Sequence, residues 1–424
     1  MNHSIRFYIY TPNWTFTPCS SCFGYSEYFD ERRMKYDAIT HKILYRHIFF
    51  SVQDKNIGYY CSTISSAPAH SLTYYPEHLK SRTNMRKTMI AFGNPLMDIT
   101  VTSKQLVPHL LRKYNLNLDD QKEIAKKEMR SLTEDIQGYE QYVSPGGCSQ
   151  NTLRVLQWIL AQQCQATMFG SVGNDLEANI LQEELKAAGV RASYITQENL
   201  STGKIIVLVS GLNRSLVAHI GAAEVFPLAT LLANPDFTLL FNSSNIVLIE
   251  AYFLTNRVET ACKLAELCQK GSKTLVFNLC GQYIFDIVPE PLKCLVNAAN
   301  LVFGNKTEFL ALAKLFTCTT LDNLAEALLG KTLIVTDGPR TLVCYNSNGE
   351  KIEIVPPVIQ LEEVKDTTAA GDAFMGGFLA GMVKSKSLKD CIKMGFYAAS
   401  CIIKECGCSL PKYEPQIDFD RMIQ

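Results

Sequence analysis

The sequence predicts an α/β fold in which a mostly parallel sheet is covered by helices. From residue 88 onward, short apolar runs alternate with segments of helical length, and each run ends at a polar or glycine-containing turn. Such alternation is typical of parallel strands joined by crossover helices. Ligands of these sheets lie outside the carboxyl ends of the strands, so the turns after the strands are candidate sites.

The elements follow from local patterns. Apolar runs of four to eight residues predict buried strands, and helix 175–188 ends before Gly189, a typical helix terminator. The block 193–220 contains several short strands and is interpreted as a β-rich insertion. The predicted elements are strand 88–92, helix 118–136, helix 153–160, strand 166–172, helix 175–188, strands within 193–220, strand 246–250, helix 256–270, strands 274–278 and 301–303, helix 307–315 and strand 332–336.

Residues 1–86 differ from the rest of the chain. They are rich in Tyr, Phe, Ser and His and show no sustained helical or strand period. We therefore expect a disordered N-terminal extension without a catalytic role, followed by one catalytic domain over 87–424. A targeting segment, or sequence upstream of a start at Met85, would fit the same composition.

The composition excludes several classes of function. The 41 basic and 41 acidic residues cancel, which argues against nucleic acid or an anionic membrane as partner. No run of 18 apolar residues appears, and fifteen irregularly spaced cysteines indicate reduced thiols, so we expect a cytoplasmic protein, with the nucleus open as a second compartment. Only His109 and His219 follow residue 80, which disfavours a histidine-based mechanism.

The strongest chemical signal is the segment 366–378. Small residues precede Asp372 at the mouth of an apolar helix, where unpaired N–H groups and the helix dipole favour a phosphate group. Asp372 could accept the proton of a substrate hydroxyl during phosphoryl transfer. The alternative is an Asp that only complements the dipole of the first helical turn.

At this segment the chain resembles the ribokinase-like carbohydrate kinase family, whose signature is D-[ST]-x-G-A-G-D, and within it the adenosine kinase branch. The resemblance covers about 88–415 and implies a Rossmann-like domain with a small β-rich lid, whose segments lie near 98–145 and 193–220. Motifs in the family's order stand at 93–99, 146–151, 213–216, 253–255, 303–308 and 397–400.

The resemblance implies which residues contact the nucleoside. Asp98 would accept hydrogen bonds from two vicinal ribose hydroxyls, and two aromatic residues would enclose the base. For each residue the alternative is an ordinary turn, cap or core role. The nucleoside-binding residues implied are Asn94, Leu96, Asp98, Gly146, Gly147, Cys148, Asn151, Leu216, Phe253 and Tyr283.

The resemblance also implies the residues of the phosphate side. Arg214 would neutralise charge on the transferred phosphoryl group. Asn305 and Glu308, three residues apart, would face one side of a helix start and hold hydrated Mg²⁺. The residues implied for ATP and its phosphates are Thr336, Gly338, Ala369, Ala370 and Gly371.

Several positions depart from the family pattern. Ala369 replaces a glycine, which would cost about 1–2 kcal/mol if the backbone there has positive φ. Cys148 stands where serine is common, and Lys306 stands where adenosine kinases often carry an acid. Residues 280–283 and Phe396 differ from the usual residues beside the base.

The reaction implied is the Mg²⁺-dependent transfer of the ATP γ-phosphate to the 5'-hydroxyl of adenosine, a step of purine salvage that gives AMP and ADP. The expected partners are adenosine and ATP, and the expected state is a monomer. Two alternatives stay open at this point. One is a kinase for another nucleoside or sugar, and the other is a nucleoside-binding pseudokinase, which Ala369 would favour.

Overall fold

The structure, a computed structural model, describes residues 87–412 except 119, 120 and 212, together with Pro415 and three strands near the N-terminus. The chain divides into two units, 1–83 and 84–424. In the first unit, β1 (Arg6–Tyr10), β2 (Phe16–Pro18) and β3 (Ile48–Ser51) form an antiparallel sheet in the order β2-β1-β3. The rest of the predicted N-terminal extension lies outside the described residues.

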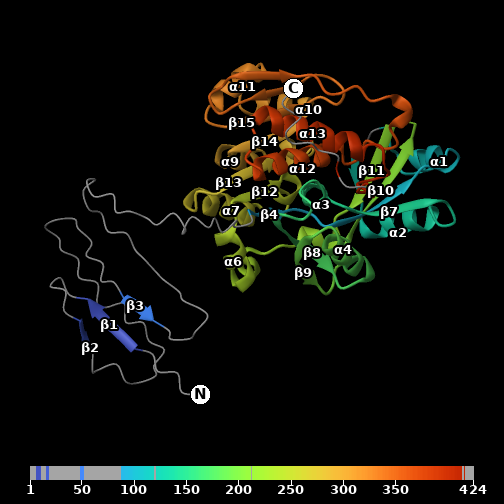
Figure 1. The fold of residues 1–424 in the computed structure, drawn as a ribbon. Coiled ribbons are helices and arrows are strands. Elements are labelled where there is room, and N and C mark those ends of the chain that lie inside the picture. Colours follow the sequence, from blue (N-terminus) through green and yellow to red (C-terminus); the bar gives the residue numbers. More distant parts are fainter. Residues whose placement is uncertain are drawn as a thin grey trace. The chain divides into compact units, whose positions relative to one another are not determined.

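A nine-stranded sheet forms the centre of the second unit (Figure 1). Seven of its strands are parallel and two antiparallel strands close one edge, which confirms the predicted α/β class. In sheet order the strands are β17 (Lys351–Ile354), β16 (Leu342–Tyr345), β15 (Thr332–Thr336), β14 (Leu301–Asn305), β13 (Thr274–Asn278), β12 (Ile246–Glu250), β4 (Thr88–Phe92), β8 (Gln165–Gly173) and β9 (Val190–Gln197).

Alternating side chains of the central strands fill two cores. In β4, Ile90 and Phe92 pack on one face of the sheet, and Met89 and Ala91 pack on the other. Such two-sided burial explains why these strands are continuously apolar. One core is covered by α3 (Cys148–Ile159), α12 (Ala370–Val383) and α13 (Leu388–Ile402); the other is covered by α7 (Val258–Lys270), α9 (Pro289–Ala298), α10 (Lys306–Leu315) and α11 (Leu321–Ala327).

A second sheet of five strands is built from two separate parts of the chain. Two helices, α1 (Leu106–Lys113) and α2 (Lys126–Asp135), pack on it and enclose a core of its own around Leu110, Leu132 and Ile206. Its strand order is β6 (Gln121–Glu123), β11 (Asn213–His219), β10 (Gly203–Ser210), β5 (Leu96–Val101) and β7 (Gln141–Gly146). The structure thus contains the small β-rich sheet that the family resemblance implied.

Three predicted boundaries were wrong. The predicted helix 118–136 begins only at Lys126, because 121–123 pair with β11 as a strand. Residues 193–197 do not belong to the insertion, since they continue β9 in the large sheet. Helix α3 begins at Cys148 rather than at residue 153, directly after Gly147 with φ 95°. Tertiary pairing decided the first two boundaries, and a glycine turn decided the third.

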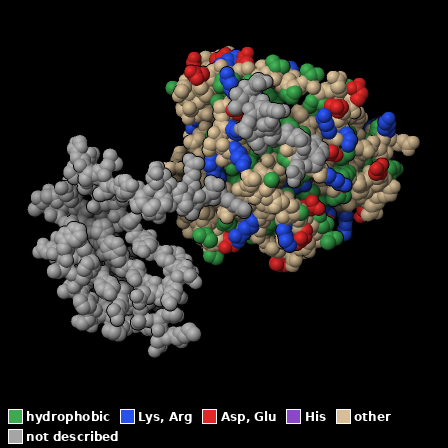
Figure 2. All heavy atoms as spheres, in the orientation of Figure 1, with side chains coloured by type: hydrophobic (Ala, Val, Ile, Leu, Met, Phe, Trp, Pro, Cys, Tyr) green, Lys and Arg blue, Asp and Glu red, His purple; other side chains and the backbone are tan. Residues whose placement is uncertain are grey.

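The surface is mixed in charge. In the face shown in Figure 2, Lys and Arg side chains lie interspersed with Asp and Glu side chains over the described part of the second unit. This agrees with the equal numbers of basic and acidic residues in the sequence. Among the described residues, no helix combines the length and apolar character that a membrane span requires.

Candidate active site

The candidate site lies at the carboxyl edge of the large sheet, as the strand order predicts. The turns after β4, β12, β13, β14 and β15 meet there with the N-termini of α3 and α12. Strands β5 and β7 of the small sheet continue directly from β4 and into α3. Both sheets therefore contribute side chains to one site.

Asp372 and Asn151 form the centre of this site. Asp372 lies in the first turn of α12, and its Oδ2 accepts a hydrogen bond of 3.0 Å from Nδ2 of Asn151 on α3. Both side chains are buried. Burial raises the pKa of Asp372 to about 7, while the Asn151 hydrogen bond opposes the shift. A carboxyl group with this pKa exchanges protons easily near neutral pH, as a general base must.

Asp98 faces the same site from β5. A methyl group on Gly146 of β7 would lie only 2.0 Å from Asp98 Oδ1, so glycine is required for the carboxyl group to fit. Gly147 is equally restricted, because its φ is 95° and a methyl group there would meet the carbonyl oxygen of Asn94. Burial, together with the charges of Asp372 and Asp366, raises the pKa of Asp98 to about 8.

Three buried oxygens of this site lack hydrogen-bond donors. Asn94 Oδ1, Asp98 Oδ1 and Asn151 Oδ1 have no partner among the described residues, and each side chain is at most 5% exposed. Buried acceptors without a donor are costly and uncommon in folded proteins. Together they form a site that would bind a ligand bearing several hydroxyl groups.

Glu250, at the end of β12, was missed by the sequence analysis. Its Oε1 accepts a hydrogen bond of 2.9 Å from the backbone N–H of Asn94, and its Oε2 accepts one of 2.7 Å from the N–H of Ser149. The carboxyl group therefore ties the turn after β4 to the first turn of α3. Glu250 is the last residue of predicted strand 246–250. Because ligands of parallel sheets bind at the carboxyl ends of the strands, its position in the sequence could have indicated a role in the site.

The loop before α12 has the conformation of an anion site. Ala369 caps the helix in the left-handed region with φ 46°, which confirms the positive φ considered for this position. Asp366 shapes the loop, because its Oδ1 accepts from the Thr368 N–H at 2.7 Å and its Oδ2 from the Gly407 N–H at 2.9 Å. Ala370, whose N–H donates to the Thr367 carbonyl oxygen at 3.2 Å, and Gly371 then open the helix. The N-terminus of such a helix favours a phosphate.

Arg214 reaches this loop from the small sheet. It lies on β11, and its Nη1 donates a hydrogen bond to Thr367 Oγ1. Its positive charge also opposes the rise in the pKa of Asp372. The structure thus brings together the predicted phosphate-side arginine, the predicted loop and the candidate base.

The aromatic residues predicted to enclose the nucleobase are arranged differently from the prediction. Phe253 was predicted as a wall, but it has no exposed area and packs against Phe226 and Phe92 with ring centroids 5.5 and 6.0 Å away. Its neighbour Tyr252 instead stacks on Tyr283 at 5.9 Å. Adjacent residues of a short 3-10 helix point to different sides, and the sequence pattern did not show which one faces the core.

The two leucines predicted to contact the nucleoside lie in the small sheet. Leu96 is buried in β5, where its Cδ2 lies 2.4 Å from the position that a methyl group on Gly203 would take. Leu216 is partly buried in β11, opposite Val207 of β10. The two leucines lie on different strands, with β10 between them.

Two thiols also belong to the candidate site. Cys148, the first residue of α3, interacts with both the Cys280 thiol and the Asp372 carboxyl group. The contact with Cys280 and burial raise the pKa of Cys148 well above its usual value, and burial raises that of Cys280. Both side chains are therefore neutral thiols near pH 7, which serve as weak hydrogen-bonding groups rather than nucleophiles.

Asn305 and Glu308 form a capping box at the start of α10. The backbone N–H of Asn305 donates to Glu308 Oε2 at 2.8 Å, and Asn305 Oδ1 accepts from the Glu308 N–H at 2.9 Å. Burial raises the pKa of Glu308 to about 8. Each side-chain oxygen of the pair accepts a hydrogen bond within this box, including one of 2.8 Å from Asn305 Nδ2 to Glu308 Oε1. Carboxylate and amide oxygens are of the kind that Mg²⁺ prefers, so these two side chains could hold the ion through its water molecules.

The predicted ATP loop follows β15. Thr336 Oγ1 donates to the carbonyl oxygen of Gly304 at 3.2 Å, and exposed Gly338 has φ 58°. Between them, Asp337 pairs with Arg340 and with Lys306, whose Nζ lies 3.3 Å from Asp337 Oδ2. Lys306, the departure from the family pattern, therefore links the start of α10 to this loop.

These features together define a class of proteins. A mostly parallel sheet with an appended small sheet, and a small-residue loop leading to a buried carboxyl group on a helix, are typical of ribokinase-like small-molecule kinases. The chain belongs to the pfkB family of carbohydrate kinases, whose model matches residues 122–415.

Several relatives and solved structures to which the chain is similar are adenosine kinases. The adenosine kinase of Saccharomyces cerevisiae is 32% identical over 338 residues, which cover 77% of this chain and 98% of the yeast protein. The adenosine kinase of Anopheles gambiae, crystallised with P1,P4-di(adenosine-5) tetraphosphate, superposes with a TM-score of 0.71 at 30% identity, covering 77% of this chain and 98% of that one. That of Schistosoma mansoni, in complex with adenosine and AMP, gives 0.68 at 25% identity, with coverage of 76% and 97%.

Proposed function

We propose that this protein is an adenosine kinase, which transfers the γ-phosphate of ATP to the 5'-hydroxyl of adenosine and releases AMP and ADP. The relatives named above carry this activity in their names and cover most of the chain. Within the chain itself, the proposal rests on a group of buried oxygens near Asp372 that lack hydrogen-bond donors among the described residues. Asn94, Asp98 and Asn151 offer oxygens to ribose hydroxyls beside Asp372.

In this proposal Asp372 is the general base. The substrate hydroxyl loses its proton to the Asp372 carboxylate as its oxygen attacks the γ-phosphorus, and the bond from phosphorus to the bridging oxygen of ADP breaks. Asn151 holds the Asp372 carboxylate in place through its hydrogen bond. The pKa of about 7 leaves a sufficient fraction of the carboxylate form at neutral pH while keeping it basic.

The charge of the transferred phosphoryl group would be balanced by three features. Arg214 brings a guanidinium group to the loop before α12, and that loop presents backbone N–H groups at the helix N-terminus. Asn305 and Glu308 would hold Mg²⁺, which supplies charge neutralisation between the phosphates when it is bound. On the base side, Tyr252 and Tyr283 would enclose the purine.

A second candidate function rests on Ala369. Its left-handed backbone is strained for alanine. If the loop before α12 holds a phosphate, the Ala369 methyl group would crowd it. A pseudokinase that binds nucleoside without turning it over would show this feature. The chain retains Asp372, Arg214, Asn305 and Glu308, which argues against a pseudokinase.

The deciding experiment measures AMP formation by the purified chain with adenosine and ATP, with and without Mg²⁺, beside Asp372→Asn. Metal-dependent turnover that Asp372→Asn loses would support the kinase. Saturable adenosine binding without turnover would support the pseudokinase. Inosine, ribose and fructose belong in the same assay, since faster turnover of any of them than of adenosine would reassign the substrate.

A further inference from the structure

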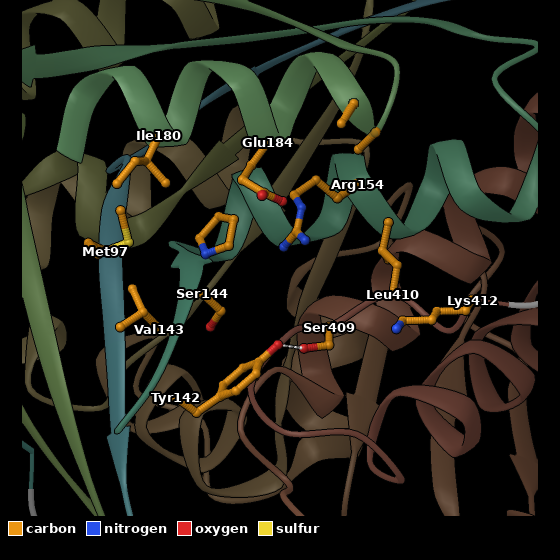
Figure 3. A pocket seen from close by; sticks show the side chains of 13 residues that line it. Met97, Tyr142, Val143, Ser144, Arg154, Ile180, Glu184, Ser409, Leu410 and Lys412 are labelled. Carbon is orange, nitrogen blue, oxygen red and sulfur yellow. Dashed lines mark hydrogen bonds between the residues drawn. The ribbon is translucent and has the colours of Figure 1, made fainter. Parts of the chain in front are cut away.

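A cavity of about 390 Å³ lies outside the candidate active site (Figure 3). Its walls come from β5, β7, α3, the helix α4 (Leu176–Ala187) and residues 409–412. None of the residues assigned to nucleoside, phosphate or metal binding lines it. Its size falls within the range of small-molecule sites, about 300–1,000 Å³.

Arg154 of α3 places a buried charge in the wall of this cavity. The side chain is 5% exposed, and its Nη1 donates a hydrogen bond of 3.0 Å to the carbonyl oxygen of Cys408. Its Nε has no hydrogen-bond partner within the described part of the chain. A guanidinium group carries five N–H donors, and leaving them unpaired in a buried position destabilises the protein.

The other polar groups of the wall surround the same space. Figure 3 shows Arg154 and Glu184 reaching toward it from α3 and α4, and Ser144 of β7 also lines it. Ser144 is 3% exposed, and its Oγ also lacks a partner among the residues described. With Lys412 at the rim, the lining carries two cations and one carboxylate, a formal charge of +1.

Apolar side chains form one part of the remaining wall, and the hydroxyl groups of Tyr142 and Ser409, hydrogen-bonded to each other, form another. Met97 of β5, Val143 of β7 and Ile180 of α4 face the cavity, and Leu410 closes another side. A ligand that pairs with Arg154 and also contacts this apolar part of the wall carries one compact polar end and an apolar body.

We propose that this cavity binds a small amphipathic monocarboxylate, with its carboxylate group paired to the Arg154 guanidinium and its apolar chain against Met97, Val143 and Ile180. A planar carboxylate matches the donor geometry of arginine, and one negative charge balances the +1 lining. A phosphate monoester would bring close to two negative charges toward Glu184, which disfavours it. The charge of Arg154 also acts on Asp98, where it opposes the rise in pKa. Binding at this cavity is nevertheless measured without adenosine or ATP, so each proposal can fail without the other.

The test measures binding of hexanoate to the full chain, with calorimetry and the shift in Tm as the two readouts. We expect hexanoate to raise Tm in proportion to the logarithm of its concentration above Kd. The comparison ligands are 1-hexanol, which lacks the charge, and hexylammonium, which reverses it. We expect both to bind at least tenfold more weakly than hexanoate. Equal binding of 1-hexanol would overturn the carboxylate site.

Two variants on α4 test whether hexanoate binds in this cavity. Ile180→Trp fills the cavity from α4, whereas Leu176→Trp adds the same side chain at a more exposed position of α4 that does not line it. We expect Ile180→Trp to weaken hexanoate binding at least tenfold and Leu176→Trp to leave it unchanged. Both are partly exposed, so both variants should fold. Undiminished binding in Ile180→Trp, or equal losses in the two variants, would show that hexanoate binds elsewhere.

Discussion

At the scale of single residues, the environment of Asp372 makes a prediction about pH. Burial raises its pKa to about 7, and only the deprotonated form can accept a proton. We expect kcat/KM for adenosine to fall about tenfold for each pH unit below 7 and to level off above it. Asp372→Asn should lose about 10²- to 10⁴-fold in kcat while still binding adenosine. A kcat/KM profile flat from pH 5 to 8 would exclude Asp372 as the base.

The second residue-scale prediction concerns Ala369. Its φ of 46° costs alanine about 1–2 kcal/mol, and glycine adopts this conformation freely. Because glycine also gains freedom in the unfolded chain, we expect Ala369→Gly to raise the free energy of unfolding by a few tenths to about 1 kcal/mol. Removing the methyl group should also raise kcat.

Ala370→Gly is the matched control for that change. Ala370 is the first residue of α12 and has helical backbone geometry, so glycine there should destabilise the protein by up to about 1 kcal/mol. Urea unfolding of both variants measures the difference. Equal destabilisation by the two substitutions would show that Ala369 is not strained.

At the scale of elements, Glu250 at the end of β12 holds the turn after β4 and the first turn of α3 together. Both carboxylate oxygens accept backbone N–H groups, from Asn94 and Ser149. Glu250→Gln keeps one acceptor and turns the amide N–H₂ toward a backbone N–H. The loss of a charged hydrogen bond, about 1.5–3 kcal/mol, should appear as a roughly ten- to hundredfold rise in KM for adenosine.

A KM effect separates positioning by Glu250 from a catalytic role. Glu250 acts through the Asn94 turn, so kcat at a pH above 7 should change little in Glu250→Gln. Its charge helps to raise the pKa of Asp372, so the pH profile should move to lower pH in this variant. Glu224→Gln changes a partly exposed acid that the site does not contain, and it should leave KM unchanged. A drop in kcat with unaltered KM would contradict the positioning role.

The elements themselves were predictable to different degrees. Strand 88–92 and strand 332–336 have the predicted limits, because apolar runs bounded by polar turns leave few alternatives. Strand β6 escaped prediction because Gln121, Lys122 and Glu123 are all exposed and polar. Its strand state comes from pairing with β11, about ninety residues later, which no local pattern reveals.

For the whole molecule, the sequence indicated which residues form the site better than how they interact. Asp372, Arg214 and Asn151 were recognised by motif, but the hydrogen bond between Asn151 and Asp372 joins residues far apart in the chain. The sequence alone did not show that Phe253 packs into the core while Tyr252 stacks on Tyr283. The cavity beside Arg154 could not be predicted either, since its walls come from five separate segments.

The buried acids of the site also set how stability of the ligand-free protein depends on pH. Burial raises the pKa of Asp98 and of Glu308 to about 8 and that of Asp372 to about 7, whereas unfolded carboxyl groups titrate near 4. Between pH 5 and 8 the native state therefore holds more protons than the unfolded state. By linkage, stability is greatest at the acidic end of this range and is lost as pH rises toward 8.

We therefore expect the free energy of unfolding in urea, without ligand, to decrease from pH 5.5 to 7.5. Each acid that stays protonated only in the native state contributes about 1.4 kcal/mol per pH unit to this slope. Asp98→Asn removes one such group and should flatten the dependence, while Asp286→Asn, at an exposed position, should not. Stability that increases over this range would mean that the site carboxyl groups are ionised in the folded protein, with a cation or an arginine closer to them than the structure places it.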